Sequence, residues 1–539
     1  MLFNDYRVHR IHLHRLLQCL CLPVIFFILI CNFTEPGECK QLFETQSFVT
    51  EGRTLAVIPV DLDDSGPVEI VIIKKTGIYP LEQRWISIFY AGDGLIYESD
   101  PRQQWEVDHD ATMFEVGDVA PTPGKEIFFL TAGGIRYYAS GNDGLYDTVS
   151  RHLVKVPTAT VFPAAGFLPR SRLLSDWQCN GQTMLMVPQF GSFLFYSQNR
   201  HGEWQASGKI ATTPRTFLHG DQEDDGILRT FSLRMDYRLP RIFTQDFNGD
   251  GRADLLLTEQ ESIFIYPHIS KGQFAQKPAV SIRLPGRPAG KGADWDSYFL
   301  AIPAEINGDG YTDMVLTLAQ STGGFLERKV EVSVFLNQKV QDSPFQGKPD
   351  KVITFYGITP GVSVVDANRD GLQDLLFSGI ELGFWNTVKN LISKEVDVLT
   401  SIYLLQGDHQ YSDEPNFYTR TEYQLDLTHG IRFNGIWPSI DGDFNGDGYP
   451  ELLIARDGKI KIYQTRQDDG LFLNSYYQAD VITCPYKHVI DLNKDGFQDI
   501  VMYEKKMSGK VSILLNRGKW EDSNNNKSKS LSRKAATKP

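Results

Sequence analysis

The nine residues Asp443-Phe-Asn-Gly-Asp-Gly-Tyr-Pro-Glu451 recur along this chain of 539 residues, and their recurrence decides the predicted fold. Four further copies keep the same order of acids, amides and glycines: Asp246–Asp254, Glu305–Asp313, Asp366–Asp374 and Asp491–Asp499. A sixth copy, Asp61–Glu69, carries Asp63 and Ser65 at its third and fifth positions. Internal similarity of this kind indicates a protein built from repeated modules.

Two weaker copies begin at Asp118 and Asp176. The first keeps an acid at its ninth position, Glu126, whereas the second has Met184 there. With these two included, a copy begins about every 61 residues, which lies in the range of known structural repeats. The spacing therefore predicts eight modules, or seven if one weak copy is misassigned.

Each clear copy lies between apolar stretches, such as Leu55–Val60 before the first copy. A third run, such as Ser262–Ile-Phe-Ile-Tyr266, alternates as half-buried strands do, and a weaker fourth run such as Lys351–Tyr356 follows. Four short antiparallel strands per repeat predict an all-β fold, a β-propeller of about eight (alternatively seven) four-stranded antiparallel blades. Gln41–Val49 is expected to complete the last blade beside Lys510–Leu515 and so to close the ring.

The repeated loops carry the oxygen atoms that calcium prefers. Side chains at positions 1, 3, 5 and 9 supply carboxylate, amide or hydroxyl oxygens, position 7 offers its backbone carbonyl, and glycine at position 6 permits a sharp turn. The predicted ligands of about five or six Ca²⁺ sites are Asp61, Asp63, Ser65, Glu69, Asp246, Asn248, Asp250, Arg252, Asp254, Glu305, Asn307, Asp309, Tyr311, Asp313, Asp366, Asn368, Asp370, Leu372, Asp374, Asp443, Asn445, Asp447, Tyr449, Glu451, Asp491, Asn493, Asp495, Phe497 and Asp499.

The D-x-N-x-D-G-x-x-D pattern of these loops resembles FG-GAP or VCBS repeats, the blade units of the propeller of integrin α-subunits and of many exported bacterial proteins. The resemblance covers most of residues 42 to 520. It implies that each loop joins the first two strands of a blade and binds Ca²⁺ through the side chains at positions 1, 3, 5 and 9. The copies at Asp118 and Asp176 depart from the pattern, and whether they bind metal stays open.

The two ends of the chain differ in composition from the repeats. Arg7, Arg10 and Arg15 precede an apolar run from Leu16 to Phe33, which predicts a signal peptide or a retained signal anchor in residues 1–40. Residues 41–520 form the predicted propeller, and 521–539 a disordered polar and basic tail. The protein is therefore expected to be secreted, periplasmic or attached to the cell envelope, with membrane contact only through the N-terminal segment.

Two long spacings predict insertions. The acidic stretch Asp221–Gly226 is expected to be an exposed loop. In 384–396, apolar residues including Phe384, Trp385 and Ile392 recur at helical spacing, which predicts a short amphipathic helix.

The leading functional hypothesis is an exported calcium-binding propeller that acts as a binding, adhesion or scaffold module, in which calcium stabilises the blades. Its expected partner is a protein or glycan on a propeller face, and the propeller is expected to be monomeric. The net charge of −13 argues against nucleic-acid binding through a basic surface. The alternatives are an extracellular carbohydrate-active enzyme and a propeller subunit of a larger envelope or toxin assembly. No catalytic residue is predicted, because the dense group Asp108-His109-Asp110 is better explained as a solvated strand edge.

Overall fold

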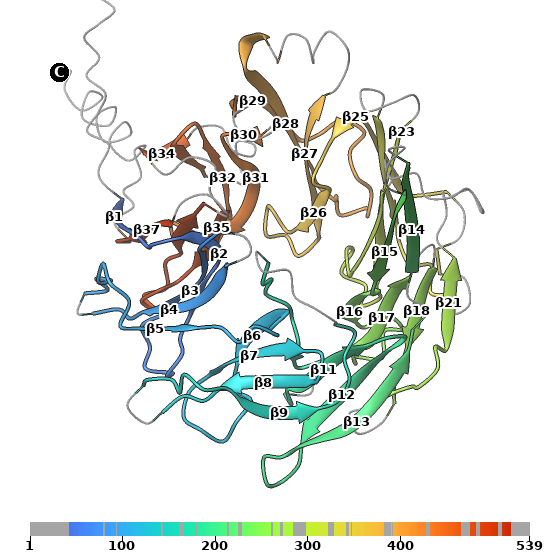
Figure 1. The fold of residues 1–539 in the computed structure, drawn as a ribbon. Helices are drawn as coiled ribbons and strands as arrows, with labels where there is room; N and C mark the ends of the chain where they lie inside the picture. Colours follow the sequence, from blue (N-terminus) through green and yellow to red (C-terminus); the bar gives the residue numbers. More distant parts are fainter. Residues whose placement is uncertain are drawn as a thin grey trace, which may run out of the picture. The chain divides into compact units, whose positions relative to one another are not determined.

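The computed structural model describes residues 42–518 with internal gaps (Figure 1). Outside the description are residues 1–41, 79–80, 93, 142–143, 161–166, 178–180, 213–214, 225–228, 260–261, 270–272, 284–297, 322–327, 341–343, 346–347, 382–389, 391, 427–431, 465–474, 481–485, 505–508 and 519–539. The predicted signal segment and tail therefore lie outside it. The chain divides into two compact units, Met1–Leu42 and Phe43–Pro539, and all the described strands belong to the second.

The described strands form eight antiparallel four-stranded blades, which we number along the chain. Blade 1 comprises β2 (Arg53–Val60), β3 (Glu69–Thr76), β4 (Gln83–Phe89) and β5 (Gln103–Glu106). Blade 2 comprises β6 (Met113–Gly117), β7 (Glu126–Thr131), β8 (Gly134–Tyr138) and β9 (Arg151–Lys155). Blade 3 comprises β10 (Leu174–Ser175), β11 (Met184–Gln189), β12 (Ser192–Gln198) and β13 (Trp204–Ala211). Blade 4 comprises β16 (Arg241–Gln245), β17 (Asp254–Glu259), β18 (Ser262–Tyr266) and β21 (Val280–Arg283).

The second half of the chain continues the pattern. Blade 5 comprises β22 (Tyr298–Ala304), β23 (Asp313–Ser321), β24 (Arg328–Phe335) and β25 (Lys351–Ile358). Blade 6 comprises β26 (Val362–Val365), β27 (Asp374–Glu381), β28 (Glu395–Tyr403) and β29 (Phe417–Asp426), and the short β30 (Arg432–Phe433) pairs with β29. The end of β25 also pairs with the end of β27, so blades 5 and 6 are continuous in one nine-stranded sheet. Blade 7 comprises β31 (Gly435–Gly442), β32 (Glu451–Arg456), β33 (Lys459–Tyr463) and β34 (Ser475–Asp480). Blade 8 comprises β35 (Tyr486–Ile490), β36 (Asp499–Tyr503), β37 (Lys510–Asn516) and β1 (Phe43–Val49).

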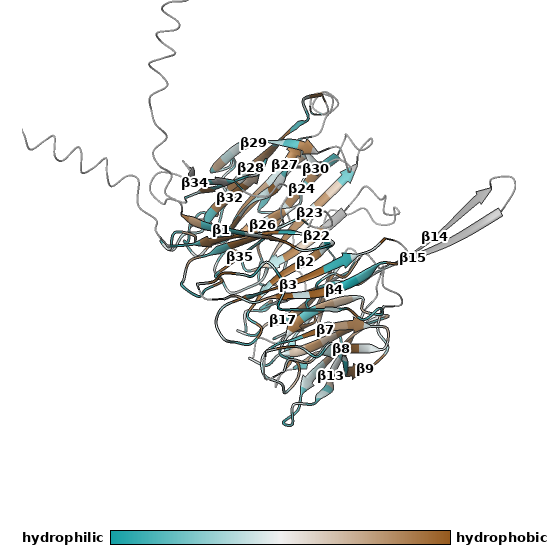
Figure 2. Ribbon diagram, turned by 60° about the vertical axis from the view of Figure 1, so that its left-hand side comes forward, coloured by the Kyte–Doolittle hydropathy of each residue, from teal (hydrophilic) through white to brown (hydrophobic). Residues whose placement is uncertain are grey.

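The second strand of each blade is buried on both faces, because a neighbouring blade covers each side. In β3, Ile70 and Ile72 pack toward blade 8, whereas Val71 and Ile73 pack toward blade 2. All four side chains have no exposed surface. This two-sided burial explains why the strand is apolar at successive positions instead of at alternate ones. Figure 2 shows such hydrophobic runs along the blade strands.

Apolar packing joins each blade to the next in chain order. Hydrophobic clusters connect blades 1 to 2, 2 to 3, 3 to 4, 4 to 5, 5 to 6, 6 to 7 and 8 to 1. Blades 7 and 8 meet where Phe43 contacts Phe444 and Tyr477, with ring centroids 6.2 and 4.9 Å apart. The blades therefore follow one another around a closed ring (Figure 1). This confirms the predicted propeller and selects eight blades over seven.

The first described strand of the chain closes the ring. β1 pairs antiparallel with β37, from Phe43 opposite Asn516 to Val49 opposite Lys510. Glu44 and Arg517 add an ion pair at the same seam. The prediction that Gln41–Val49 completes the last blade is therefore confirmed for the described residues.

The inserted segments agree with their predictions only in part. The acidic stretch near Asp221 belongs to a two-stranded hairpin of β14 (Arg215–Asp224) and β15 (Arg229–Arg238), so it is more ordered than the loop predicted for it. The smaller hairpin of β19 (His268–Ile269) and β20 (Gln273–Phe274) lies within blade 4. Most of the predicted helix 384–396 falls outside the description. Its described residues Asn390, Ile392 and Ser393 are helical, but Glu395 already begins β28 because it pairs with β29.

Within the described part of the chain, we find no helix long and apolar enough to cross a membrane.

Candidate metal-binding loops and a neighbouring pocket

The repeated nonapeptides join the first and second strands of the blades, as the resemblance implied. We call them loops 1 to 8 after their blades and number their positions 1 to 9. They are loop 1 (61–69), loop 2 (118–126), loop 3 (176–184), loop 4 (246–254), loop 5 (305–313), loop 6 (366–374), loop 7 (443–451) and loop 8 (491–499). Position 9 is in every case the first residue of the second strand.

The side chains of each clear loop fold inward onto its own backbone. In loop 4, Asp246 accepts hydrogen bonds from the N–H groups of Gly249 and Gly251 at 2.8 and 2.7 Å. The Oδ1 atom of Asn248 accepts from the N–H of Asp250 at 2.9 Å, and the Oδ1 atom of Asp250 accepts from the N–H of Arg252 at 2.9 Å. Gly251, at position 6, has a φ of 79°, which glycine adopts readily. The loop therefore gathers oxygen atoms around one small volume.

The position 9 acid is buried and connects three segments when it is aspartate. In loop 6, Asp374 accepts hydrogen bonds from the N–H groups of Ala367 and Leu405, both at 2.9 Å. In loop 8, Asp499 accepts from Leu492 at 2.8 Å and from Asn516 at 2.6 Å. Loops 4 and 5 repeat the arrangement through both oxygens of their terminal aspartates. Aspartate at this position therefore ties the start of the loop to the end of the third strand.

Glutamate at position 9 behaves differently because its side chain is one methylene longer. In loop 7, single oxygen atoms of Asp443, Asp447 and Glu451 lie within 4.8 Å of one another. The acids of loop 1, Asp61, Asp63 and Glu69, form the same kind of group. Among the described residues, these are the two places where three acids converge in this way. The sequence pattern treated both acids as equivalent and gave no signal of this difference.

Burial makes the ionised form of the position 9 acids unfavourable unless a cation lies nearby. Burial, reinforced by Asp370 and Asp366, raises the pKa of Asp374 to about 7. Burial likewise raises the pKa of Glu451 to about 9, with Asp447 and Asp443 adding to the effect. Ionised acids grouped in a buried site repel one another unless a cation lies among them.

The donor atoms fit calcium, a hard cation that takes six to eight oxygen ligands. In loop 6, the buried Oδ1 atom of Asp366 has no hydrogen-bond partner in the described structure, so it is available to a metal ion. Carboxylates of Asp366 and Asp370 and the amide oxygen of Asn368 surround the same turn. The individual ligands predicted from the sequence remain a prediction.

The loops of neighbouring blades are linked by a repeated backbone hydrogen bond. The carbonyl at position 2 of one loop accepts from the N–H at position 8 of the next. This bond joins Leu62 to Lys125 at 2.7 Å, Ile306 to Gln373 at 2.9 Å and Leu492 to Val68 at 3.1 Å. Ordering one loop therefore also orders the loop that comes after it.

Each of the two weak copies lacks a side-chain oxygen at one ligand position. In loop 2, Ala120 is at position 3, and Glu126 accepts from Val119, Ala120 and Thr122 of its own loop. In loop 3, the position 9 residue is the buried Met184, which belongs to a hydrophobic cluster. Loop 3 thus has an apolar side chain where the clear copies have an acid.

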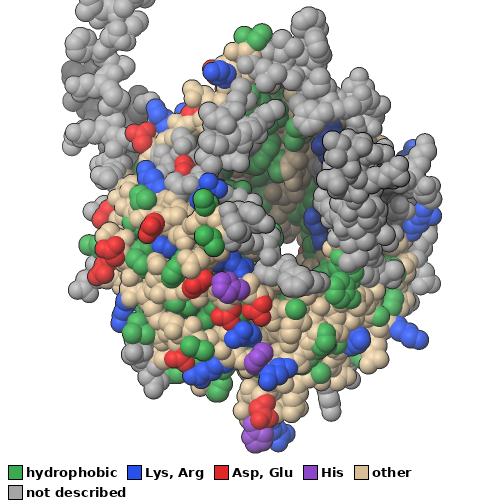
Figure 3. Space-filling view, viewed as in Figure 1, with side chains coloured by type: hydrophobic (Ala, Val, Ile, Leu, Met, Phe, Trp, Pro, Cys, Tyr) green, Lys and Arg blue, Asp and Glu red, His purple; other side chains and the backbone are tan. Residues whose placement is uncertain are grey.

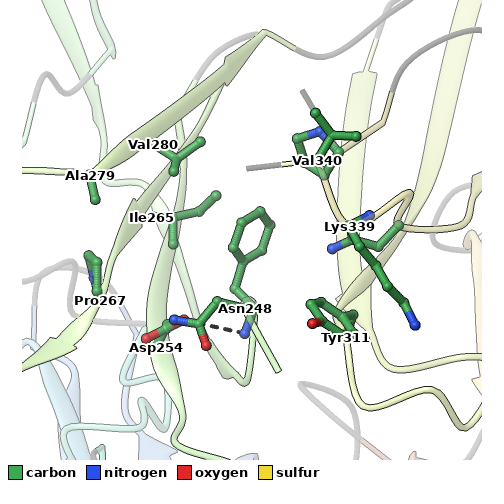
Figure 4. A pocket seen from close by; sticks show the side chains of 12 residues that line it. Asn248, Asp254, Ile265, Pro267, Ala279, Val280, Tyr311, Lys339 and Val340 are labelled. Atoms are coloured by element: carbon green, nitrogen blue, oxygen red, sulfur yellow. Dashed lines mark hydrogen bonds between the residues drawn. The ribbon is translucent and has the colours of Figure 1, made fainter. Parts of the chain in front are cut away.

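A pocket of about 260 Å³ lies beside loops 4 and 5, between blades 4 and 5. In Figure 4, Ile265, Pro267, Ala279 and Val280 line one side, and Tyr311, Lys339 and Val340 line the other. Its base includes Asp254, whose oxygens accept hydrogen bonds from Phe247 and His268.

Loop 5 forms part of the pocket wall. The Tyr311 ring faces Gly249 of loop 4, where an added Cβ would come within 2.7 Å of the ring. The ammonium of Lys339 lies 4.7 Å from the centroid of the same ring and 3.3 Å from Asp309. Pocket and loops therefore share side chains. The sequence could not indicate the pocket, because its walls come from segments far apart in the chain.

The acid–histidine group of the second blade has a structural role. Asp108 pairs with Arg136 at 2.9 Å and accepts hydrogen bonds from Tyr138 and Ser150. The His109 side chain is 89% exposed. The group therefore lies in the β5–β6 turn, which Asp108 connects to blade 2, and not on the strand edge that the sequence predicted. On the face seen in Figure 3, acidic and basic side chains are interspersed over the described surface.

A family model described as FG-GAP-like repeat matches residues 246–316 and 443–502, the segments that contain loops 4, 5, 7 and 8. These segments are FG-GAP-like repeats. No curated protein shows significant sequence similarity to the chain. The matching family model and the eight four-stranded blades together confirm the recognised repeat and the propeller.

The chain is similar to several solved structures at low sequence identity. An Agrocybe aegerita lectin, described as recognising non-reducing terminal N-acetylglucosamine, is 13% identical, with 89% of this chain and 96% of that chain covered and a TM-score of 0.37. The V. cholerae biofilm matrix protein Bap1 is 12% identical, with 88% and 89% covered and a TM-score of 0.31. The WD40 domain of Toxoplasma gondii coronin is 8% identical, with 89% and 88% covered and a TM-score of 0.32.

Proposed function

We propose that this protein is an exported, calcium-stabilised propeller that binds a protein or glycan ligand. The observation that carries the proposal is the recurrence of loops whose inward-facing oxygens surround one turn and whose position 9 acids are buried. Calcium in loops 1 and 4 to 8 would neutralise these acids and hold the first two strands of each blade together.

Ligand binding is assigned to the pocket between blades 4 and 5. Its volume of about 260 Å³ lies just below the range of about 300–1,000 Å³ typical of small-molecule sites. It therefore suits one sugar ring or one amino-acid side chain. Apolar residues such as Ile265 and Val280 offer surface for carbon atoms, while Asn248 and Tyr311 add polar groups.

The alternative of a carbohydrate-active enzyme requires two carboxyl groups flanking the substrate. Of the residues that line this pocket, Asp254 is the one acid, and both of its oxygens already accept backbone hydrogen bonds. A binding role therefore suits this pocket better than glycoside hydrolysis.

Calcium dependence is tested by thermal unfolding of the purified protein in calcium and in EDTA. A site that binds only the folded state adds about 2.7 kcal/mol when calcium exceeds its Kd a hundredfold. Several such sites should raise the melting temperature substantially. An identical melt in EDTA would refute the proposed role of calcium.

Ligand binding is tested by glycan-array and pull-down measurements on the wild type and on Ala279→Trp. Ala279 is exposed at the pocket wall, so an indole there should fill the cavity without disturbing the core. The variant should lose its ligand and keep the calcium-dependent melt. Ligand binding that is unchanged in Ala279→Trp would place the site elsewhere.

A further inference from the structure

Both walls of the pocket between blades 4 and 5 are held by the acid at position 9 of a loop. On one side, the Oδ1 atom of Asp254 accepts a hydrogen bond from the N–H of His268 at 2.9 Å, and His268 follows the lining residue Pro267. On the other side, the Oδ1 atom of Asp313 accepts from the N–H of Asn337 at 2.7 Å, and Asn337 lines the pocket itself. The second oxygen of each aspartate accepts from the N–H at position 2 of its own loop. A single carboxylate on each side thus connects a loop to a wall.

Asn337 begins the segment that supplies much of the second wall. Its Nδ2 atom donates to the backbone carbonyl of Thr312, at position 8 of loop 5, at 3.0 Å. Its Oδ1 atom accepts from the N–H of Lys339 at 2.8 Å. The N–H of Gln338 donates to the carbonyl of Pro344 at 2.9 Å, and Lys339 and Pro344 both line the pocket. The position of this wall therefore depends on loop 5.

Loops 4 and 5 also supply side chains that line the pocket (Figure 4). Asn248 is at position 3 of loop 4, and its side chain is one of the predicted calcium ligands. Tyr311 is at position 7 of loop 5, where the predicted ligand is its backbone carbonyl. The Tyr311 ring lies so close to Gly249 of loop 4 that a Cβ there would come within 2.7 Å of it. A rearrangement of either loop would therefore displace groups that line the pocket.

A calcium ion would fix the groups on which the walls depend. Each carboxylate oxygen that accepts one N–H keeps a second lone pair, so Asp254 and Asp313 can bind a cation while they hold the walls. In a loop without a cation the ionised acids repel one another. The hydrogen bonds from His268 and Asn337 then end on side chains that are held less firmly. A ligand that binds to ordered walls loses less conformational entropy than one that must order them, so its affinity should be higher with calcium.

Building on the proposed function, we propose that calcium in loops 4 and 5 switches on glycan binding in the pocket between them. A glycan suits the pocket because apolar residues such as Ile265 and Val280 can contact the carbon face of a sugar ring, while Asn248 and Tyr311 can bind its hydroxyl groups. Calcium in loops 1, 7 and 8, which do not adjoin loops 4 and 5, stabilises other blades and leaves the pocket unchanged. Because coupling between two binding sites is reciprocal, a bound glycan also raises the calcium affinity of loops 4 and 5 by the same factor.

The first test follows the walls without any ligand, by hydrogen–deuterium exchange in saturating calcium. It compares Asp250→Asn in loop 4 with Asp495→Asn in loop 8. The two acids are matched, since both are exposed, occupy position 5 and accept from the N–H at position 7 at 2.9 Å. Peptides that contain His268 should exchange at least about fivefold faster in Asp250→Asn than in the wild type, whereas Asp495→Asn should leave them unchanged. Glu305→Gln, at position 1 of loop 5, should likewise speed exchange at Asn337.

The second test measures binding to a glycan array. The wild type should bind in calcium and lose the signal in EDTA. In calcium, Asp250→Asn and Glu305→Gln should bind the same glycan at least about fivefold more weakly than the wild type, and Asp495→Asn should bind it as the wild type does. Calorimetric titration with calcium should show one ion fewer in each of the three variants. The comparison therefore separates calcium beside the pocket from calcium elsewhere in the ring.

The outcomes separate this inference from the proposed function. Unchanged exchange and glycan binding in Asp250→Asn and Glu305→Gln, each with one ion lost, would overturn this inference and leave the proposed function intact. Equal losses in all three variants would overturn it as well, because calcium would then act on the whole ring. A wild type that binds no calcium, or no glycan in calcium, would refute the calcium or the glycan part of the proposed function, and this inference with it.

Discussion

Asp374 and Asp370 belong to the same loop, yet we expect them to act through different physical effects. Asp374→Ala removes the acceptor of two N–H groups, those of Ala367 and Leu405, both of which belong to buried residues. Each buried N–H left without a partner costs about 1–3 kcal/mol. The variant should therefore lose about 2–6 kcal/mol of stability even without metal.

Asp370→Ala is the matched control. Asp370 is exposed and accepts from Leu372 and from the amide of Asn368 within the loop. Exposed substitutions of this kind usually change stability by less than about 0.5 kcal/mol. In EDTA, only Asp374→Ala should melt at a clearly lower temperature, whereas in calcium both variants should lose the stabilisation due to loop 6. Equal melts of the two variants in EDTA would show that the position 9 acid acts through metal alone.

Three further predictions concern other parts of the fold. Phe43→Ala should cost about 3–5 kcal/mol in a denaturant titration, because Phe43 is fully buried between blades 7 and 8; a loss below about 1 kcal/mol would contradict the closing role of β1. Burial lowers the pKa of His488 below 6.5, so stability should fall as the pH drops through that value, and His488→Gln should flatten this decline in melts between about pH 7.5 and 5; equal slopes would show that another group titrates. Replacing 215–236 by a short linker, which keeps Tyr237 and its hydrogen bond from Gly191, should leave the melt of the blades unchanged, because β14 and β15 pair with each other; a collapsed melt would show that the rest of the hairpin supports blade 3 or 4.

The blades could be predicted because buried strands and metal-binding loops each require particular residue types, and these residue types recur at regular intervals in the sequence. Ser262–Tyr266 is a strand with the bounds predicted from the sequence, because its side chains alternate as in a half-buried strand. The closing strand could also be predicted. The last blade lacks a fourth strand at its C-terminal end, and the segment Gln41–Val49 near the N-terminus can supply it.

Other features depend on three-dimensional contacts between residues, which cannot be derived from the pattern of a single sequence. The hairpin around Asp221 has polar and charged residues that suggest a loop, but cross-strand pairing orders it. Whether a position 9 acid reaches the interior of its loop depends on a single methylene, as Asp374 and Glu451 show. The contact of Lys494 with Asp61 joins residues 433 positions apart.

The pairing of β1 with β37 also sets an order of events during synthesis. Seven blades are each made from one continuous stretch of chain and can form as soon as that stretch emerges. The eighth requires the strand made first to meet three strands made last. Until the last three strands have been made, Phe43 and Phe48, which are buried in the folded protein, remain exposed to solvent. The N-terminal strand is thus the part of this molecule most in need of protection from aggregation while the chain is being completed.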